Sequence, residues 1–409
     1  MATAEPGQLM RLALPGNPHL TYCTNIHPGE TWPEIKANLE KYLPHVKARV
    51  SPGAPMGVGL RLSGEAASML ASASALDALR GFLAEHDLYI FTINAFPYGP
   101  FHGRPVKEQV YEPDWRTTER VAFTNACADI LAALLPDGQD GSISTVPGAF
   151  KAKIETAADV TLMAENMIRA AAHLHALAVE RGPCITLALE PEPCCFLEIT
   201  DEAIAFFEQH LLGARAAALM SCLTGLSASE ARAALQRHLG LCFDVCHAAV
   251  EFEDPAESFG RIQRAGIRIA KLQLSSAIKV ARTGPATEAL LKPFDDGIYL
   301  HQTVASWHGK LTRHADLPQA FTALEQSQAS GAEWRVHCHV PVFLETFGDL
   351  SSTQDVLADV LAICREQEIS PHLEVETYTW GVLPKALTNG DLGGDISREM
   401  QWVRSQLRA

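Results

Sequence analysis

The sequence has little positive charge and no long hydrophobic run. Among its 409 residues, 33 Lys and Arg stand against 48 Asp and Glu, which gives a formal net charge of -15. Nucleic acids and anionic membranes are bound through basic surfaces, so we expect neither as a partner. No segment approaches the roughly 18 consecutive apolar residues of a membrane-spanning helix, so membrane insertion is not expected.

Repeated C-x-x-C pairs are also missing, although the chain has ten cysteines. Several of these cysteines lie inside apolar runs, as Cys184, Cys242, Cys246 and Cys364 do. We therefore interpret them as reduced and mostly buried thiols. The first residues of the chain lack the long apolar core of a secretory signal. Both observations predict a cytoplasmic protein.

No internal repeat, low-complexity tract or domain linker divides the chain. We therefore predict one domain over residues 1–409, with residues 1–18 as an N-terminal extension. Two long segments, 96–150 and 275–316, exceed a minimal fold and are expected to form loop excursions near the active site. The start of the first segment is rich in aromatic residues, proline and glycine.

Apolar segments of strand length alternate with longer segments whose apolar residues recur every three or four positions. The eight candidate strands cover residues 19–26, 56–62, 88–94, 185–190, 241–245, 268–274, 335–340 and 372–377. This alternation predicts a parallel α/β fold, and both a doubly wound sheet and a (β/α)8 TIM barrel fit it.

The polar residues decide between these two folds. They fall at the carboxyl ends of the candidate strands, where a barrel gathers its active site. These residues are Asn94, Glu190, Asp244, Gln273, His339 and Glu376. We therefore predict a (β/α)8 barrel with long loops at its C-terminal face.

If the strands close into a barrel, four of these side chains, Glu190, Asp244, His339 and Glu376, converge. Three carboxylates placed together repel one another and raise each other's pKa, and a divalent cation relieves that repulsion. Oxygen and nitrogen ligands together suit Mn²⁺, Zn²⁺, Co²⁺ or Mg²⁺. Gln273 completes the expected metal ligands through its amide oxygen.

Other roles remain open for several of these residues. Asp244 is placed to cap the following helix, and Glu190 to form a salt bridge at the strand end. His247, which follows Asp244 by three positions, fits a packed helix-start histidine as well as a ligand. Lys271 is expected to pair with a barrel carboxylate, while Glu374 looks like an ordinary strand-start residue.

The expected catalytic residues are Glu190, Glu376, His247 and Lys271. The two glutamates would exchange a proton with the substrate, while His247 and Lys271 would polarise its carbonyl. Residues expected to contact the substrate come from the end of the first candidate strand, from the long loops and from the segment after the last strand. They are His27, Phe96, Tyr98, His102, His301 and Trp380.

The order Glu190, Asp244-x-x-His247 and Glu376 resembles the xylose isomerase-like TIM-barrel superfamily. In its epimerase branch, Glu ends the fourth strand, Asp-x-x-His the fifth, His the sixth and Glu the eighth. The resemblance implies a metal-dependent enzyme. Gln273 stands where the family has its sixth-strand histidine, and His339 would supply the missing nitrogen ligand.

A closer resemblance is to the metabolite traffic protein EboE group. It rests on the segments "LTYCTNIHPGETW", "STVPGAFK", "LALEPEP", "CFDVCH" and "HCHVPVF". This resemblance implies a context in bacterial secondary metabolism, with other proteins of the same gene cluster as partners. Neither the reaction nor the oligomeric state follows from it.

The leading hypothesis is a metal-dependent isomerase or epimerase of a sugar, cyclitol or related small molecule. A metal-dependent hydrolase of a small phosphoester is the first alternative, because His27, His102, His301, His337 and His339 offer further ligands. A non-catalytic metabolite carrier that retains the barrel is the second alternative, and the glutamine at position 273 is its main support.

Overall fold

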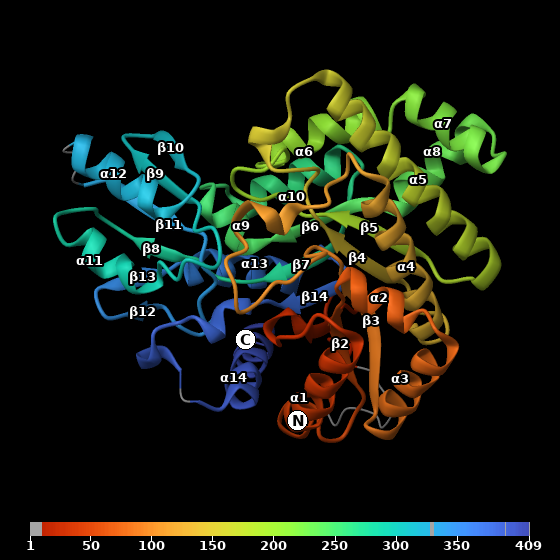
Figure 1. Cartoon of the computed structure of the whole chain (residues 1–409), viewed down its shortest axis with the longest axis horizontal. Coiled ribbons are helices and arrows are strands. Elements are labelled where there is room, and N and C mark those ends of the chain that lie inside the picture. The colour runs from red at the N-terminus through yellow and green to blue at the C-terminus, as the bar shows by residue number, and fades with distance from the viewer. Residues whose placement is uncertain (1–9, 328–330, 389, 409) are drawn as a thin grey trace.

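The computed structural model describes residues 10–327, 331–388 and 390–408. In these residues, eight parallel strands form one sheet, in the order β1-β14-β7-β6-β5-β4-β3-β2 (Figure 1). The strands are β1 His19–Tyr22, β2 Met56–Arg61, β3 Leu88–Asn94, β4 Gly141–Thr145, β5 Ile185–Leu189, β6 Leu239–Asp244, β7 Arg268–Leu274 and β14 His372–Val375.

The barrel closes between its first two strands. A parallel bridge joins Cys23 to Gly59, and the Thr21 hydroxyl donates to the Gly57 carbonyl at 2.8 Å and accepts from the Gly59 amide at 2.9 Å. A Cβ at Gly59 would lie 2.0 Å from Glu374 Oε1. Glycine at this position therefore allows the first two strands to meet directly beside the buried side chain of Glu374. The predicted (β/α)8 barrel is confirmed.

One predicted strand was wrong. Residues 335–340 do not belong to the barrel, and β4 takes that place from within the segment 96–150 that we expected to be a loop excursion. As a result, Glu190 follows the fifth barrel strand and Asp244 ends the sixth, one strand later than the sequence predicted. Gln273 lies on the seventh strand rather than the sixth.

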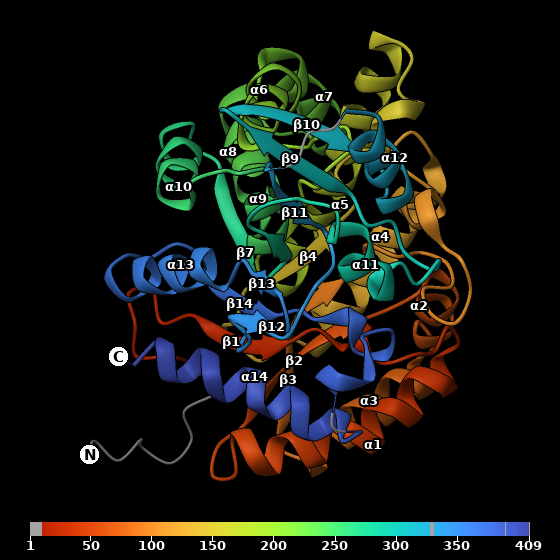
Figure 2. The same ribbon diagram turned by 90° about the vertical axis from the view of Figure 1, so that its left-hand side faces the viewer.

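A second sheet is inserted between β7 and helix α13, and we call it the added sheet. Figure 1 shows it to one side of the barrel, and Figure 2 shows it facing the viewer. The segment 275–316, expected as a loop excursion, forms much of it. Its strands run in the order β10-β9-β11-β8-β13-β12 and are β8 Ile278–Val280, β9 Thr303–Trp307, β10 Lys310–His314, β11 Glu333–Val336, β12 Thr346–Phe347 and β13 Leu350–Ser352.

Helices cover the outside of the barrel. The first, α1, begins after Thr31, whose hydroxyl accepts from the Glu34 amide and so caps the helix. The helices are α1 Trp32–Val50, α2 Gly64–Leu70, α3 Ala73–Glu85, α4 Thr118–Leu134, α5 Ala157–Arg181, α6 Thr200–Phe206, α7 Ala214–Thr224, α8 Ala228–His238, α9 Val245–Val250, α10 Pro255–Arg264, α11 Thr287–Leu291, α12 Leu317–Ser327, α13 Gln354–Glu366 and α14 Leu392–Gln406. None of the described helices has the length and apolar character needed to cross a membrane.

The inside of the barrel is polar. Lys271 Nζ lies 2.6 Å from Glu374 Oε2 and 3.2 Å from Ser144 Oγ, and both partners of the ion pair are fully buried. The His372 ring binds Ser142 Oγ at 2.8 Å nearby. The prediction that Lys271 pairs with a barrel carboxylate is confirmed, whereas the interpretation of Glu374 as an ordinary residue was wrong.

Candidate metal centre

Three carboxylates meet at the carboxyl end of the barrel. Glu190 follows β5, Asp244 ends β6 and Glu376 follows β14, and one donor oxygen from each lies within 4.8 Å of the others. All three residues are at most 4% exposed. The convergence predicted from the strand ends therefore exists in the structure.

Asp244 has two roles, one for each oxygen. Its Oδ1 accepts from the His247 amide at 3.0 Å, which caps α9, and from the Ser275 hydroxyl at 2.7 Å. Its Oδ2 is buried without a hydrogen-bond partner. The helix cap and the metal ligand, which the sequence left as alternatives, are therefore compatible in one side chain.

Two asparagines hold the carboxylate of Glu376. Asn25 Nδ2 donates to Glu376 Oε1 at 2.6 Å, and Asn94 Nδ2 lies 3.3 Å from the same oxygen. Asn94 ends β3, while Asn25 lies in a short 3-10 helix after β1. The two asparagines hold Oε1 of Glu376, and the second oxygen of this carboxylate remains available at the cavity.

Two histidines stand beside the carboxylates, because donor atoms of Asp244, His247 and His339 also lie within 4.8 Å of one another. His339 Nδ1 is 2.8 Å from the Glu376 carbonyl, and its Nε2 is buried without a partner. Burial lowers the pKa of His247 to about 4 against the opposing effect of Asp244. Its imidazole is therefore neutral near pH 7, as a metal ligand must be.

These residues fit a divalent metal ion. Buried polar atoms are almost always paired, yet Glu190 Oε2, Asp244 Oδ2 and His339 Nε2 have no hydrogen-bond partner in the structure. All three atoms are electron-pair donors once the carboxylates are ionised. Oxygen donors with one imidazole suit Mn²⁺, Zn²⁺, Co²⁺ or Mg²⁺.

Burial, and next the charge of a neighbouring carboxylate, raises the pKa of both Glu190 and Glu376 well above 4.5. Without metal, the folded protein keeps these protons at pH values where the unfolded chain has lost them. The contribution of the two protonated glutamates to the free energy of unfolding is therefore fully present below about pH 4.5. It is lost as the pH rises through their raised pKa values.

A divalent ion should reverse this loss, because it binds the ionised carboxylates. We expect the difference in Tm between protein with excess Mn²⁺ and protein with a chelator to widen from about pH 5 to about pH 8. Thermal unfolding measured by fluorescence across this range checks the prediction. A difference that is constant or narrows with pH would contradict it.

Gln273 is less well placed as a ligand. It pairs in register with Asp244, but its Oε1 accepts from the Cys242 thiol at 3.2 Å. Its Nε2 has no partner. A metal bond through Oε1 would compete with the thiol contact, so ligation by Gln273 stays a prediction.

A cavity opens above the carboxylates. The predicted loop at the start of the segment 96–150 supplies one wall, and the loop before β9 and the residues after β11 supply another. The lining residues are Asn25, Asn94, Phe96, Pro97, Phe101, Val106, Lys107, Val110, Tyr111, Glu190, Glu192, His247, Tyr299, Leu300, His337, His339, Glu376 and Tyr378.

Most of the side chains expected to contact the substrate lie outside this cavity. Of the six expected side chains, only Phe96 lines this cavity. His27 stacks on Tyr42 at 4.3 Å, and Trp380 Nε1 donates to Glu399 at 3.0 Å.

The other three expected contacts also lie elsewhere. Tyr98 packs against Phe123, His102 lies against Phe101, and His301 is buried 3.4 Å from Asp296. Lys271, expected to be catalytic, lies one layer deeper in the barrel than the cavity and is held by Glu374.

Several cavity residues were missed, among them Glu192, Tyr111 and Tyr378. Glu192 comes two residues after Glu190 in "LALEPEP", and this repeated glutamate was the available signal. His337 and His339 fall within the predicted strand 335–340, but β11 ends at Val336 and both residues follow it in a loop. Their rings nevertheless both reach the cavity.

Known proteins resemble this chain in structure only. No protein-family model and no curated protein matches the sequence. A xylose isomerase-like TIM-barrel protein from Mycobacterium smegmatis, solved in complex with magnesium, has a TM-score of 0.51 and 12% identity, with 97% of each chain covered.

Two further solved structures are more distant. The probable 3-DHS dehydratase AsbF of petrobactin synthesis from Bacillus anthracis has a TM-score of 0.47 and 11% identity, and covers 94% of this chain and 98% of its own. An L-ribulose 3-epimerase has a TM-score of 0.45 and 11% identity, and covers 95% of this chain and 94% of its own. At these identities the likeness is one of fold.

Proposed function

Starting from the xylose isomerase-like TIM-barrel fold of this chain, we propose that it is a metal-dependent isomerase or epimerase of a sugar, cyclitol or related small metabolite. The observation that carries the proposal is the group of three buried carboxylates, two of which have an unpaired oxygen, beside the unpaired His339 Nε2. Glu190, Glu376 and His339 line a cavity at the carboxyl ends of the barrel strands, which is the face where such enzymes act.

Glu190, Asp244, Glu376 and His339 would hold the metal. When bound, a divalent ion polarises substrate oxygens and makes the neighbouring C–H more acidic. Magnesium is bound by the solved structure from Mycobacterium smegmatis. The mixed donors found here do not select one metal, so Mn²⁺, Zn²⁺, Co²⁺ and Mg²⁺ all belong to the proposal.

Glu190 and Glu376 are proposed to remove and return the substrate proton. Both carboxyl groups line the cavity, so an ionised oxygen of either one can accept a proton from the carbon of a bound substrate. Asn25 and Asn94 hold Glu376 so that its orientation survives the loss of its proton. Lys271 does not line the cavity, but its positive charge lowers the pKa of both glutamates from inside the barrel.

Aromatic side chains complete the cavity. Phe96, Phe101, Tyr299 and Tyr378 line it, and Phe101 lies 5.2 Å from Tyr299 and 5.3 Å from Tyr378 between ring centres. Such a wall excludes water from a carbanion-like intermediate and packs against the C–H face of a sugar or cyclitol. The polar groups then face the oxygens of the substrate.

Proton exchange tests the proposal directly. Ketoses, cyclitols and their phosphates would be incubated in D₂O with the protein and Mn²⁺, and carbon-bound deuterium measured by NMR. We expect exchange with at least one compound and a loss of more than about 100-fold in Glu190→Gln. Glu180→Gln, at the exposed end of α5, should retain the rate. No exchange with any compound, or full exchange by Glu190→Gln, would refute the proposal.

A second candidate function is hydrolysis of a small phosphoester. It is favoured by the group Glu192, His247 and His337, whose donor atoms lie within 4.8 Å of one another beside the carboxylates. Release of inorganic phosphate without deuterium exchange would identify it. Binding of a metabolite with neither outcome would instead support the carrier, the other alternative from the sequence.

The context of the reaction stays a prediction from sequence. Membership of the EboE group, a role in secondary metabolism, a cytoplasmic location and partners from the same gene cluster all rest on the sequence resemblance or on composition. They belong to the proposal as its setting. The barrel and its carboxylates support the chemistry independently of them.

A further inference from the structure

Two buried histidines face each other beside the carboxylates. His247, on α9, and His337, after β11, bring their Nε2 atoms to 3.1 Å from each other. Two ring nitrogens at this distance need something between them, either a proton or a metal ion. The other hydrogen bonds of the two rings decide where their protons are.

His247 carries its proton on Nδ1. This atom lies 2.9 Å from the carbonyl oxygen of Pro191, which can only accept a hydrogen bond. In the neutral ring, the proton on Nδ1 leaves a lone pair on Nε2. The Nε2 atom of His247 therefore points an acceptor at His337.

His337 has the same tautomer. Its Nδ1 lies 2.7 Å from Gln302 Oε1. The orientation of the Gln302 amide is fixed, because its Nε2 is 3.1 Å from Glu192 Oε1 and 3.2 Å from the Pro193 carbonyl, both acceptors. A flipped amide would put an oxygen against both of these acceptors, so Nδ1 of His337 must donate to Gln302.

Two neutral rings therefore direct lone pairs at each other. Nitrogens at ~2.0–2.1 Å from a tetrahedral zinc ion are about 3.3 Å apart. We propose that His247 and His337, with Glu192 as a third ligand, form a second metal position that prefers a borderline ion such as Zn²⁺ or Co²⁺. Donor atoms of the three residues lie within 4.8 Å of one another.

The second position differs from the first in its ligands. Three carboxylates and one imidazole accept hard ions as well as zinc and cobalt, whereas a pair of imidazoles favours zinc and other later transition metals over hard ions. The ring orientations are set by Pro191 and Gln302 in the way that outer hydrogen bonds orient histidine ligands in metal sites. This inference rests on ring geometry and holds whichever reaction the protein catalyses.

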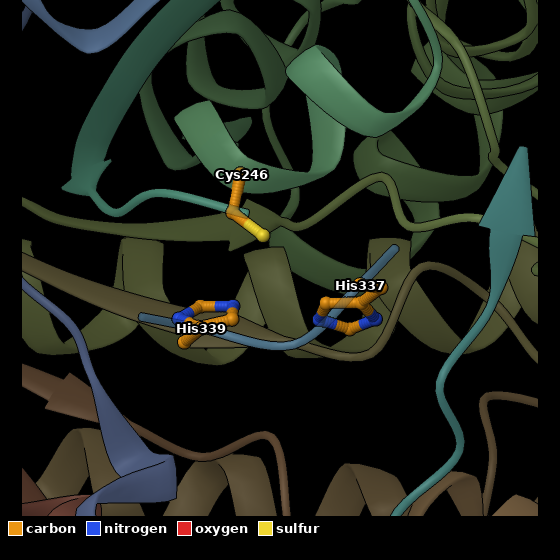
Figure 3. A group of neighbouring side chains, drawn as sticks. All are labelled: Cys246, His337 and His339. Carbon is orange, nitrogen blue, oxygen red and sulfur yellow. The ribbon is translucent and has the colours of Figure 1, made fainter. Parts of the chain in front are cut away.

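Cys246 offers a competing ligand set. Figure 3 shows its sulfur directed toward the rings of His337 and His339, and donor atoms of these three residues also lie within 4.8 Å of one another. However, Cys246 packs against Val250 in a small apolar cluster. The thiol therefore lies on the apolar side of the rings, and its contribution can be separated by substitution.

Zinc stoichiometry tests the proposal. The chelator-treated protein would be saturated with Zn²⁺, freed of excess by gel filtration and analysed by mass spectrometry for metal. We expect about two ions per chain in the unaltered protein and about one in His337→Gln. Cys246→Ser should retain both ions, as should the control His314→Gln on β10 of the added sheet.

Anomalous scattering at the zinc edge provides a second measurement that needs no variant. A peak between His247 Nε2 and His337 Nε2 is expected. No peak there, zinc content unchanged in His337→Gln, or a peak held by Cys246 would overturn the proposal. Failure of this test leaves the carboxylate site and the proposed function standing. Confirmation would favour the phosphoester hydrolase over the isomerase, because paired ions stabilise both oxygens of such a displacement.

Discussion

Replacement of Asp244 by asparagine is expected to lower the affinity for a divalent ion by more than about 100-fold. The amide nitrogen would replace Oδ2, the oxygen that has no partner, and an amide nitrogen is not a metal ligand. Oδ1 would still accept from the His247 amide and from Ser275, and asparagine caps helices as well as aspartate does. The fold should therefore remain while metal binding is lost.

Calorimetric titration with Mn²⁺ measures this loss. Asp254→Asn is a matched control, because Asp254 caps α10 through the Glu257 amide and is remote from the carboxylates. It should bind the metal as tightly as the unaltered protein does. If Asp244→Asn retained affinity within a few-fold, the carboxylate site would be wrong, and with it the proposed function.

Replacement of Lys271 by methionine is expected to destabilise the protein by ~3–5 kcal/mol. The change leaves the carboxylate of Glu374 inside the barrel without its 2.6 Å partner, in a place where neither residue is exposed to water. The double variant Lys271→Met/Glu374→Leu should regain most of the loss, because it removes both buried charges and keeps similar volume. Urea unfolding of metal-free protein measures both changes.

A surface ion pair provides the comparison. Lys279 binds Asp355 at 2.8 Å, and Asp355 is largely exposed. Lys279→Met should cost less than about 1 kcal/mol, because water screens such pairs. If Lys271→Met cost no more than Lys279→Met, the buried pair would contribute little to stability, contrary to its place in the barrel.

The sequence predicted the barrel because its strongest signal was repeated. Seven of the eight barrel strands have the apolar runs that identify buried strands, and β3 and β7 match their predicted bounds. The missed strand, β4, reads GSIST. Its Ser142 and Ser144 point into the barrel and bind His372 and Lys271, so a polar interior removed the hydrophobic pattern on which the prediction depends.

The convergence of the carboxylates was predictable from the sequence, and most of the cavity lining was not. Glu190, Asp244 and Glu376 lie at strand ends, and the barrel fixes where strand ends meet. The loop histidines had no such constraint. His27 packs on Tyr42 inside the structure, whereas His337 reaches the cavity from beyond β11. The path of the added sheet decides that His337 arrives at the site, and no short-range pattern encodes that path.

The proposed metal ligands come from two parts of the chain, the barrel and the insertion that forms the added sheet. The barrel strands and their ends contribute the oxygen donors and most of the buried core, while the chain after β11 contributes His337 and His339. Exchange of residues 278–352 for another insertion would therefore remove His337 and His339 without a change in any barrel strand. Changes confined to this insertion can therefore alter the ligands of the site, and with them its chemistry, while the barrel stays the same.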